Sequence, residues 1–327
     1  MCTNRFRCFS TLAKSTLAKS TLALSTALAA LVATVPARAD EPLFGYTYTT
    51  DLLPQGKWEI EQWGTTRLTK AQGKFQSFEG RTEVSYGVTD RFQLSFYGNY
   101  AWAHADRQNV DGTTSPPEFL AGPVFDPNSV FRKSKFTGFS VEAIYRVFSP
   151  YTDPIGLALY FEPTVGQGLR GFETRAIFQK NFLDDLLVVA FNIKLEQEVR
   201  LLQGDPTADP LSDDFRTHWD KETDLNFSLG ISYRFMPNWS LGFEIMNERE
   251  FAGLEFWRSK FATNSAYYLG PNIHYGGKNF FFTLTALQQM PWASDYTNPP
   301  SNVIFKGRNY ADDFEKYRVR VKAGWVF

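Results

Sequence analysis

Cysteine and histidine are scarce in this sequence. Both cysteines, Cys2 and Cys8, lie near the N-terminus, and the three histidines are His104, His218 and His274. If the N-terminal residues are removed on export, the mature chain has no thiol for a disulfide, a nucleophile or a cysteine-based metal site. Neither cysteine lies beside a signal-peptide cleavage site, which argues against a lipoprotein anchor.

Long apolar runs are also missing after residue 40. The longest, residues 186–191, has six residues, whereas a helix that spans a membrane needs roughly 20. Lipid offers no hydrogen-bond partner to an unpaired backbone group, so a membrane-embedded chain of this kind has to be a closed β-barrel.

Residues 1–39 have the features of a secretory signal peptide. A basic stretch is followed by an apolar one at 22–35 and by the small-x-small site Ala37-Arg38-Ala39, so the mature chain should begin near Asp40. An uncleaved N-terminal membrane anchor is the alternative. The predicted signal holds five of the 34 basic residues and none of the 35 acidic ones. The mature chain is therefore acidic, which argues against nucleic acid as a partner.

Aromatic residues, in contrast, are abundant: 31 Phe, 15 Tyr and 8 Trp make up 17% of the chain. In residues 224–235 the apolar positions are Leu225, Phe227, Leu229, Ile231, Tyr233 and Phe235, with polar or small residues between them. The same alternation recurs at 92–100, 187–196 and 317–327. A period of two predicts β-strands. A broad aromatic face opposite a polar face is typical of a wall between lipid and a polar lumen.

Twelve such strands are predicted. Their approximate ranges are 57–68, 78–88, 91–103, 135–148, 155–166, 171–181, 186–199, 222–235, 239–250, 262–275, 279–290 and 314–327. Connections after even-numbered strands are tight, whereas several after odd-numbered strands are long and polar. Bacterial barrels have short turns on the periplasmic side and longer loops on the outer side. The sequence therefore predicts an all-β fold, a transmembrane antiparallel up-and-down β-barrel over 57–327. Residues 40–56 would form a short periplasmic segment, and both termini would lie in the periplasm.

Three segments carry a resemblance to known families. The C-terminal sequence YRVRVKAGWVF, which ends in Phe327, resembles the assembly signal of proteobacterial outer-membrane proteins, and this implies that barrel-assembly machinery reads the last strand. The segments YGVTDRFQLSFYGNY and TDLLPQGKWEIEQW resemble a family of uncharacterised proteobacterial outer-membrane barrels. More loosely, they resemble transport barrels linked to the degradation of aromatic compounds. The resemblance covers most of residues 44–327 and implies a barrel in the outer membrane of a Gram-negative bacterium, without a substrate or a catalytic motif.

Charged residues on the polar faces of the predicted strands are the candidate lumen lining. The ten acidic and eight basic residues are Glu59, Glu61, Arg81, Glu83, Glu142, Arg146, Glu162, Glu173, Arg175, Lys194, Glu196, Glu198, Arg234, Glu244, Glu248, Arg318, Arg320 and Lys322. They have two interpretations: cross-strand ion pairs that fill a narrow barrel, or the lining of a water-filled path with mixed selectivity. The first strand breaks the pattern, because Gln62 would face lipid and Trp63 the lumen.

Barrel closure gives a specific expectation for the first and last strands, which must pair because an open edge cannot survive in lipid. If both charged faces point inward, Glu59 and Glu61 meet Arg318, Arg320 and Lys322 across this seam. Each directly opposed pair of charges would contribute roughly 0.2–1 kcal/mol.

The sequence offers little evidence for a catalytic site or a metal-binding site. A lipid hydrolase would need a serine and a histidine at one membrane depth, but Ser265 and His274 are nine residues apart on one predicted strand, roughly 30 Å at about 3.3 Å per residue. The acidic segments 204–210 and 212–214 could hold a hard cation but lack the spacing of a calcium loop. No enzymatic activity and no cofactor are expected.

The sequence thus favours a passive channel or porin-like transporter in the outer membrane, with outer-membrane lipid, the barrel-assembly machinery and small solutes as partners. The alternative is a structural envelope protein with a plugged lumen whose loops bind something outside the cell. An outer-membrane lipid hydrolase is the third and weakest interpretation.

Overall fold

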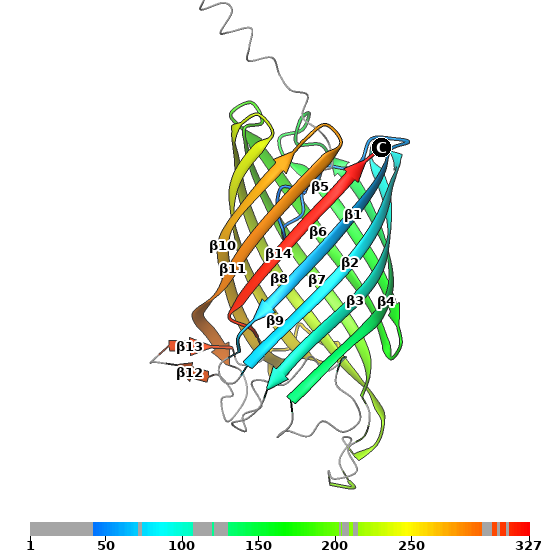
Figure 1. The fold of residues 1–327 in the computed structure, drawn as a ribbon, viewed down its shortest axis with the longest axis vertical. Helices are drawn as coiled ribbons and strands as arrows, with labels where there is room; N and C mark the ends of the chain where they lie inside the picture. The colour runs from blue at the N-terminus through cyan, green and yellow to red at the C-terminus, as the bar shows by residue number, and fades with distance from the viewer. Residues whose placement is uncertain are drawn as a thin grey trace, which may run out of the picture. The chain divides into compact units, whose positions relative to one another are not determined.

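The computed structural model describes residues 42–70, 74–106, 120, 130–202, 204, 209–211, 215–295, 303–305, 308–311 and 314–327. These residues form a barrel of twelve antiparallel strands, which confirms the predicted fold (Figure 1). The predicted signal peptide, residues 1–39, lies outside the described residues. Within the part of the chain that is described, no helix is long and apolar enough to cross a membrane.

The barrel strands agree with the predicted ranges to within a few residues. They are β1 (Trp58–Leu68), β2 (Lys74–Thr89), β3 (Phe92–Asp106), β4 (Val130–Phe148), β5 (Gly156–Gly166), β6 (Leu169–Phe182), β7 (Leu187–Leu202), β8 (His218–Met236), β9 (Trp239–Ala252), β10 (Ala262–Gly276), β11 (Phe280–Asp295) and β14 (Tyr317–Val326). A small hairpin of β12 (Val303–Phe305) and β13 (Arg308–Tyr310) lies between β11 and β14, in a segment predicted as loop.

The two ends of the barrel differ in the length of their connections. At one end, residues 90–91, 237–238 and 277–279 join neighbouring strands in tight turns. At the other end, residues 107–129 and 203–217 form long connections. We call these the short-turn end and the long-loop end; they lie at the top and bottom of Figure 1. The segregation of the loops agrees with the prediction that several connections after odd-numbered strands are long, and β5 and β6 are joined at the long-loop end by residues 167–168 alone.

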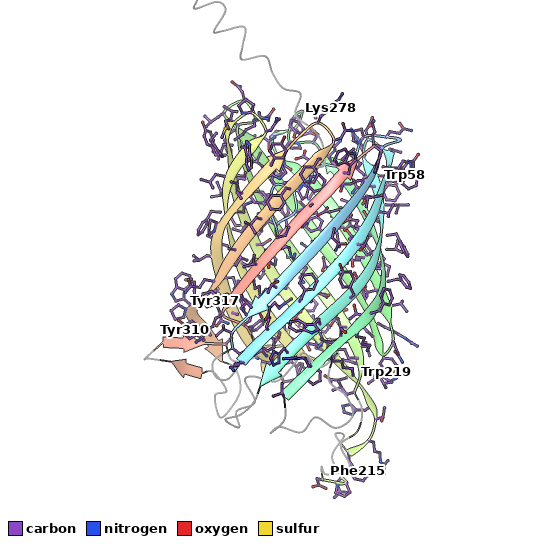
Figure 2. The ribbon with its side chains drawn as sticks, in the orientation of Figure 1. Trp58, Phe215, Trp219, Lys278, Tyr310 and Tyr317 are labelled. Atoms are coloured by element: carbon purple, nitrogen blue, oxygen red, sulfur yellow. The ribbon has the colours of Figure 1, made fainter. Side chains whose placement is uncertain are left out.

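The distribution of side chains is inverted relative to a soluble protein. Large apolar residues such as Phe96 and Phe161 are about half exposed on the outer face. Aromatic pairs such as Trp58 with Tyr86 lie near the short-turn end, and Trp219 and Tyr317 lie toward the long-loop end (Figure 2). Buried positions, in contrast, include many serines, threonines and glutamates. An apolar outer wall with aromatic girdles and a polar interior is the arrangement that lipid imposes on a barrel.

The first strand shows how the irregular positions Gln62 and Trp63 are accommodated. Gln62 is exposed on the outer face, where its amide donates to the hydroxyl of Tyr100 at 2.9 Å and accepts from Thr82 at 2.7 Å. Trp63 is buried inside, and its indole N–H donates to Glu83 at 3.1 Å. Both polar groups therefore have partners despite the break in the pattern.

The seam between β1 and β14 closes the barrel with a stagger that the sequence did not predict. Glu59 and Glu61 are buried on the inner face, as expected. Glu61, however, lies opposite Gly324, while Lys322 lies opposite Trp63 and Arg320 opposite Thr65. Alternation fixes which face a side chain takes but not how far one strand slides along another. The expected direct opposition of acids and bases across the seam is therefore wrong.

A charge on the outer wall should destabilise the barrel. Phe161 is outward-facing and lies midway along β5, so Phe161→Arg should lower the free energy of unfolding in lipid vesicles by roughly 2–4 kcal/mol. Denaturant titration followed by tryptophan fluorescence measures this, with Phe161→Leu as the control for lost aromatic contacts. Equal stability of the arginine and leucine variants would contradict a lipid-facing wall.

Candidate functional site

The inner space of the barrel is occupied at the short-turn end by residues 42–53, which we call the strap. The carboxylate of Glu244 on β9 is fully buried and accepts hydrogen bonds from the backbone N–H groups of Gly45, Tyr46 and Thr47 at 2.8, 2.9 and 2.9 Å. The hydroxyl of Thr285 donates to the same carboxylate at 2.8 Å. Three successive N–H groups around one carboxylate form an anion nest, which fixes the strap against β9 and β11.

Side-chain amides hold the rest of the strap. Asn192 on β7 accepts from the N–H of Tyr48 at 2.7 Å and donates to its carbonyl at 2.9 Å. Gln179 on β6 accepts from the N–H of Thr50 at 2.6 Å, and Gln93 on β3 accepts from that of Leu53 at 2.8 Å. These amides give the strap the backbone partners that a neighbouring strand would otherwise supply. Residues 42–53, which belong to the expected short periplasmic segment 40–56, thus pack inside the barrel at its short-turn end.

Ring contacts fill the space around the strap. Phe44 is fully buried against β8 at Gly230, where an added Cβ would lie 2.7 Å from the ring of Phe44. Tyr48 packs on Tyr160 with ring centroids 5.3 Å apart, and the guanidinium of Arg175 lies 4.4 Å from the ring of Tyr48. Gly230 is therefore required for this close approach, because a larger residue would displace Phe44.

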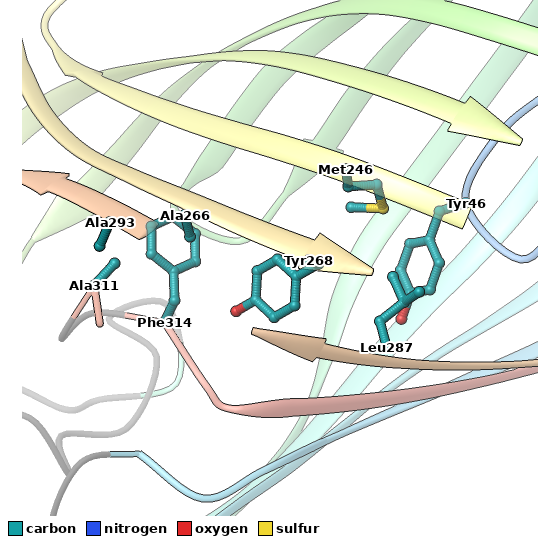
Figure 3. Packing of buried hydrophobic residues seen from close by; sticks show 8 residues of the cluster. All are labelled: Tyr46, Met246, Ala266, Tyr268, Leu287, Ala293, Ala311 and Phe314. Atoms are coloured by element: carbon teal, nitrogen blue, oxygen red, sulfur yellow. The ribbon is translucent and has the colours of Figure 1, made fainter. Parts of the chain in front are cut away.

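A second segment, which lies between β13 and β14 and includes Ala311 and Glu315, enters the lumen nearer the long-loop end. The side chain of Gln289 on β11 accepts from the N–H of Ala311 at 3.0 Å and donates to the carbonyl of Glu315 at 3.1 Å. Tyr268 donates to the same carbonyl at 2.6 Å. Figure 3 shows the resulting cluster, which runs from Phe314 through Tyr268 to Tyr46 of the strap.

Beside the strap and this second segment, the lumen contains a cavity of about 800 Å³. Its lining reaches from Tyr46 and Trp63 near the strap to Lys70, Asp220 and Lys221 near the long-loop end. Acidic side chains outnumber basic ones in this lining by eleven to nine. The cavity is large enough for a small solute and its water, and its wall is hydrophilic.

Most charges around the cavity are arranged in ion pairs. Arg318 donates to both carboxylate oxygens of Glu248 and also pairs with Glu315. Lys194 pairs with Glu196 at 2.6 Å. Further pairs join Arg67 to Glu79, Arg81 to Glu162, Arg175 to Glu173, and Arg200 to Glu198 and Glu222. These pairs compensate the removal of charge from bulk water and stiffen the inner wall.

All eighteen charged residues expected in the lumen are buried or half-buried. Ten line the cavity: Arg81, Glu162, Glu173, Arg175, Lys194, Glu196, Glu198, Glu248, Arg318 and Arg320. The other eight are Glu59, Glu61, Glu83, Glu142, Arg146, Arg234, Glu244 and Lys322, on strand segments closer to the short-turn end. Glu244, which holds the strap, thus has a role that a list of charged lumen residues does not reveal.

Sequence reasoning missed other charged residues of the cavity. Arg200, Glu222, Asp224 and Glu250 line it beyond the predicted candidates. Oxygen atoms of Glu222, Asp224 and Glu250 lie within 4.8 Å of one another, and Arg200 donates to Glu222 at 3.0 Å. Glu222, Asp224 and Glu250 lie within the predicted strands 222–235 and 239–250, and Arg200 follows the predicted strand 186–199 directly, so extending the alternation to the strand ends would have identified them. The acidic segments 205–208 and 212–214 lie outside the described residues.

The histidine and serine weighed for a hydrolase are engaged in separate contacts. His274 is buried on β10, and its Nδ1 lies 2.8 Å from the hydroxyl of Thr283. Ser265, nearer the other end of β10, accepts from the amide of Asn247 at 3.0 Å. The Nδ1 atom of His218 lies within hydrogen-bond distance, 2.9 Å, of the carbonyl oxygen of Arg216. This geometry gives the hydrolase interpretation no support.

The closed barrel with its polar lumen has the fold of outer-membrane β-barrels. The chain belongs to DUF6662, a family of unknown function whose model matches residues 36–327. This confirms the resemblance to an uncharacterised barrel family. The sequence matches no curated protein.

Several solved outer-membrane channels and porins are similar to this chain at low sequence identity. An outer membrane channel of Pseudomonas putida F1 is 10% identical, with a TM-score of 0.54 over 85% of this chain and 98% of that one. The KdgM porin is 13% identical, with a TM-score of 0.42 over 82% and 99% of the two chains. The CymD monoaromatic hydrocarbon channel is 10% identical, with a TM-score of 0.39 over 83% and 88%.

Loss of the Glu244 carboxylate should release the strap. Glu244→Ala removes the acceptor for three buried N–H groups, and hydrogen bonds to a charged group contribute roughly 1.5–3 kcal/mol each. Limited proteolysis of detergent-solubilised protein should then cut within residues 42–53 at least tenfold faster than in the wild type. Glu196→Ala, which removes a carboxylate remote from the strap, is the control. Equal cutting rates in the wild type and Glu244→Ala would show that the carboxylate does not hold the strap.

Proposed function

We propose that this protein is a passive outer-membrane channel for small solutes, with its long-loop end outside the cell and both termini in the periplasm. The observation that carries the proposal is the charged cavity of about 800 Å³ inside the barrel. Charged and polar walls keep such a space hydrated, and a small polar solute can replace that water. The segregation of short and long connections supports the orientation, because bacterial barrels place their short turns in the periplasm.

The strap favours a second candidate function. Buried residues such as Phe44, Leu52 and Leu53 occupy the short-turn end of the lumen. If the strap stays seated, the barrel is plugged there, and the protein is a structural envelope protein whose outer loops or open cavity bind a partner. A channel lets ions cross the barrel, whereas a plugged barrel does not.

Conductance of purified protein in planar lipid bilayers separates the two candidates. A channel should give small, reproducible current steps in the wild type, and Glu244→Ala should enlarge them or make them more frequent because the strap is loosened. Steps that appear only after deletion of residues 42–53 would indicate a plugged barrel. A correctly folded barrel that passes no current in any of the three forms would overturn the channel proposal.

Phe327 is proposed to act in assembly, through the barrel-assembly machinery, more than in the stability of the finished barrel. Its side chain is 56% exposed, although its N–H donates to the carbonyl of Trp58 at 2.8 Å. Deletion of Phe327 should lower the amount of barrel in the outer membrane several-fold and induce an envelope stress response. The thermal midpoint of the molecules that do insert should stay within a few degrees of the wild type. Normal outer-membrane levels after the deletion would count against this role.

A further inference from the structure

The three basic residues on the inner face of β14 differ sharply in their partners. Arg318 is almost fully buried and donates to Glu248 and Glu315. Lys322 is buried over Trp63, with its Nζ 3.6 Å from the ring centroid. Arg320, between them, lines the cavity and makes no ion pair with the described residues. A base that faces a cavity without a carboxylate partner is available to an incoming anion.

The guanidinium of Arg320 is nevertheless held in place. Its Nε donates to the hydroxyl of Thr65 at 2.8 Å, and its Nη1 donates to the carbonyl of Gly45 at 3.1 Å. Its central carbon lies 3.9 Å from the ring centroid of Tyr46 and 5.3 Å from that of Trp63. Nη2 makes no hydrogen bond with the described residues. The planar group is thus fixed on one edge by neutral acceptors, and its other edge keeps donors for a ligand.

The surroundings of Arg320 favour an anion of low charge. Arg318 and Lys322 lie two residues away on the same face, and Arg67 is opposite Arg318 across the seam. Arg67 and Arg318 are already paired with carboxylates, so they add little uncompensated positive charge beside Arg320. The cavity as a whole has an excess of acidic side chains, which works against a doubly charged ligand such as phosphate.

The lining near Arg320 also offers apolar surface. Tyr46, Trp63, Met246 and Phe314 all belong to the cavity wall. A ligand with a carboxylate at one end and a small apolar or aromatic body can place the first on Arg320 and the second against these side chains. Arginine matches carboxylates because its donors form a planar fork.

We infer that Arg320 forms a binding site for small monocarboxylates inside the lumen, with its donors on the carboxylate. The site deepens the proposed channel function, because a solute that passes through the cavity meets Arg320 at the strap. The alternative is that Arg320 serves only to anchor the strap through the carbonyl of Gly45.

Isothermal titration of the full mature protein in detergent tests the site, with benzoate as the probe and benzamide as its uncharged analogue, at constant ionic strength. Wild-type protein should bind benzoate saturably, and benzamide at least tenfold more weakly. Arg320→Gln should weaken benzoate binding at least tenfold, and Arg320→Lys should restore part of it. Lys221→Gln, which removes another base of the cavity wall, should leave binding unchanged.

Two further outcomes decide between ligand site and strap anchor. Limited proteolysis of Arg320→Gln reports on the strap, because the anchor interpretation expects residues 42–53 to be released when the carbonyl of Gly45 loses its donor. Weaker benzoate binding with residues 42–53 cut at the wild-type rate supports the site, whereas faster cutting together with the loss of binding would overturn it in favour of the anchor. No saturable binding of benzoate, equal binding of benzamide, or equal binding of phosphate would also overturn it. None of these results depends on bilayer current, so the site can fail while the channel proposal stands, and the reverse.

Discussion

The closed ring of backbone hydrogen bonds between strands is the constraint from which the rest of this structure follows. In lipid an unpaired strand edge has no partner, so β1 must meet β14, and every strand must alternate between an apolar and a polar face. The polar face then points into a lumen whose dielectric is lower than that of water. Charges placed there need partners, and the ion pairs of Arg318, Lys194 and Arg175 meet that need. The lumen's charge pattern is thus a consequence of barrel closure.

The backbone groups of the strap also need hydrogen-bond partners inside the barrel, at its short-turn end. A peptide inside a barrel cannot join the sheet, because the strands have already used their own backbone groups. Its N–H and C=O groups must therefore find side chains, and Glu244, Asn192, Gln179 and Gln93 supply them. The same strap provides the carbonyl that orients Arg320. The packing of the strap in the short-turn end and the chemistry of the cavity floor are consequently linked through a few hydrogen bonds.

Alternation in the sequence was sufficient to predict the twelve strands, their directions and the inner face, because lipid makes the contrast between faces strong. It could not predict the stagger at the seam, where Glu61 lies opposite Gly324 and not opposite a base. The strap was also missed, since its alternation is confined to Phe44, Tyr46 and Tyr48 and its partners are ordinary polar residues on distant strands. Asn192 and Gln179 look like any lumen-facing amide until the chain is folded.

The central claim is that the strap divides the lumen into an accessible cavity and a protected short-turn end. Ser228 and Ser232 on β8 test it directly, because they flank Gly230, the contact point of Phe44. Ser228 lines the cavity, whereas Ser232 is 2% exposed. Both natural cysteines precede residue 40, so Ser228→Cys and Ser232→Cys each introduce a single thiol into residues 40–327. A membrane-impermeant thiol reagent added to intact cells should label Cys at 228 readily and leave Cys at 232 protected. Equal labelling of the two positions, or no labelling at 228, would contradict the account.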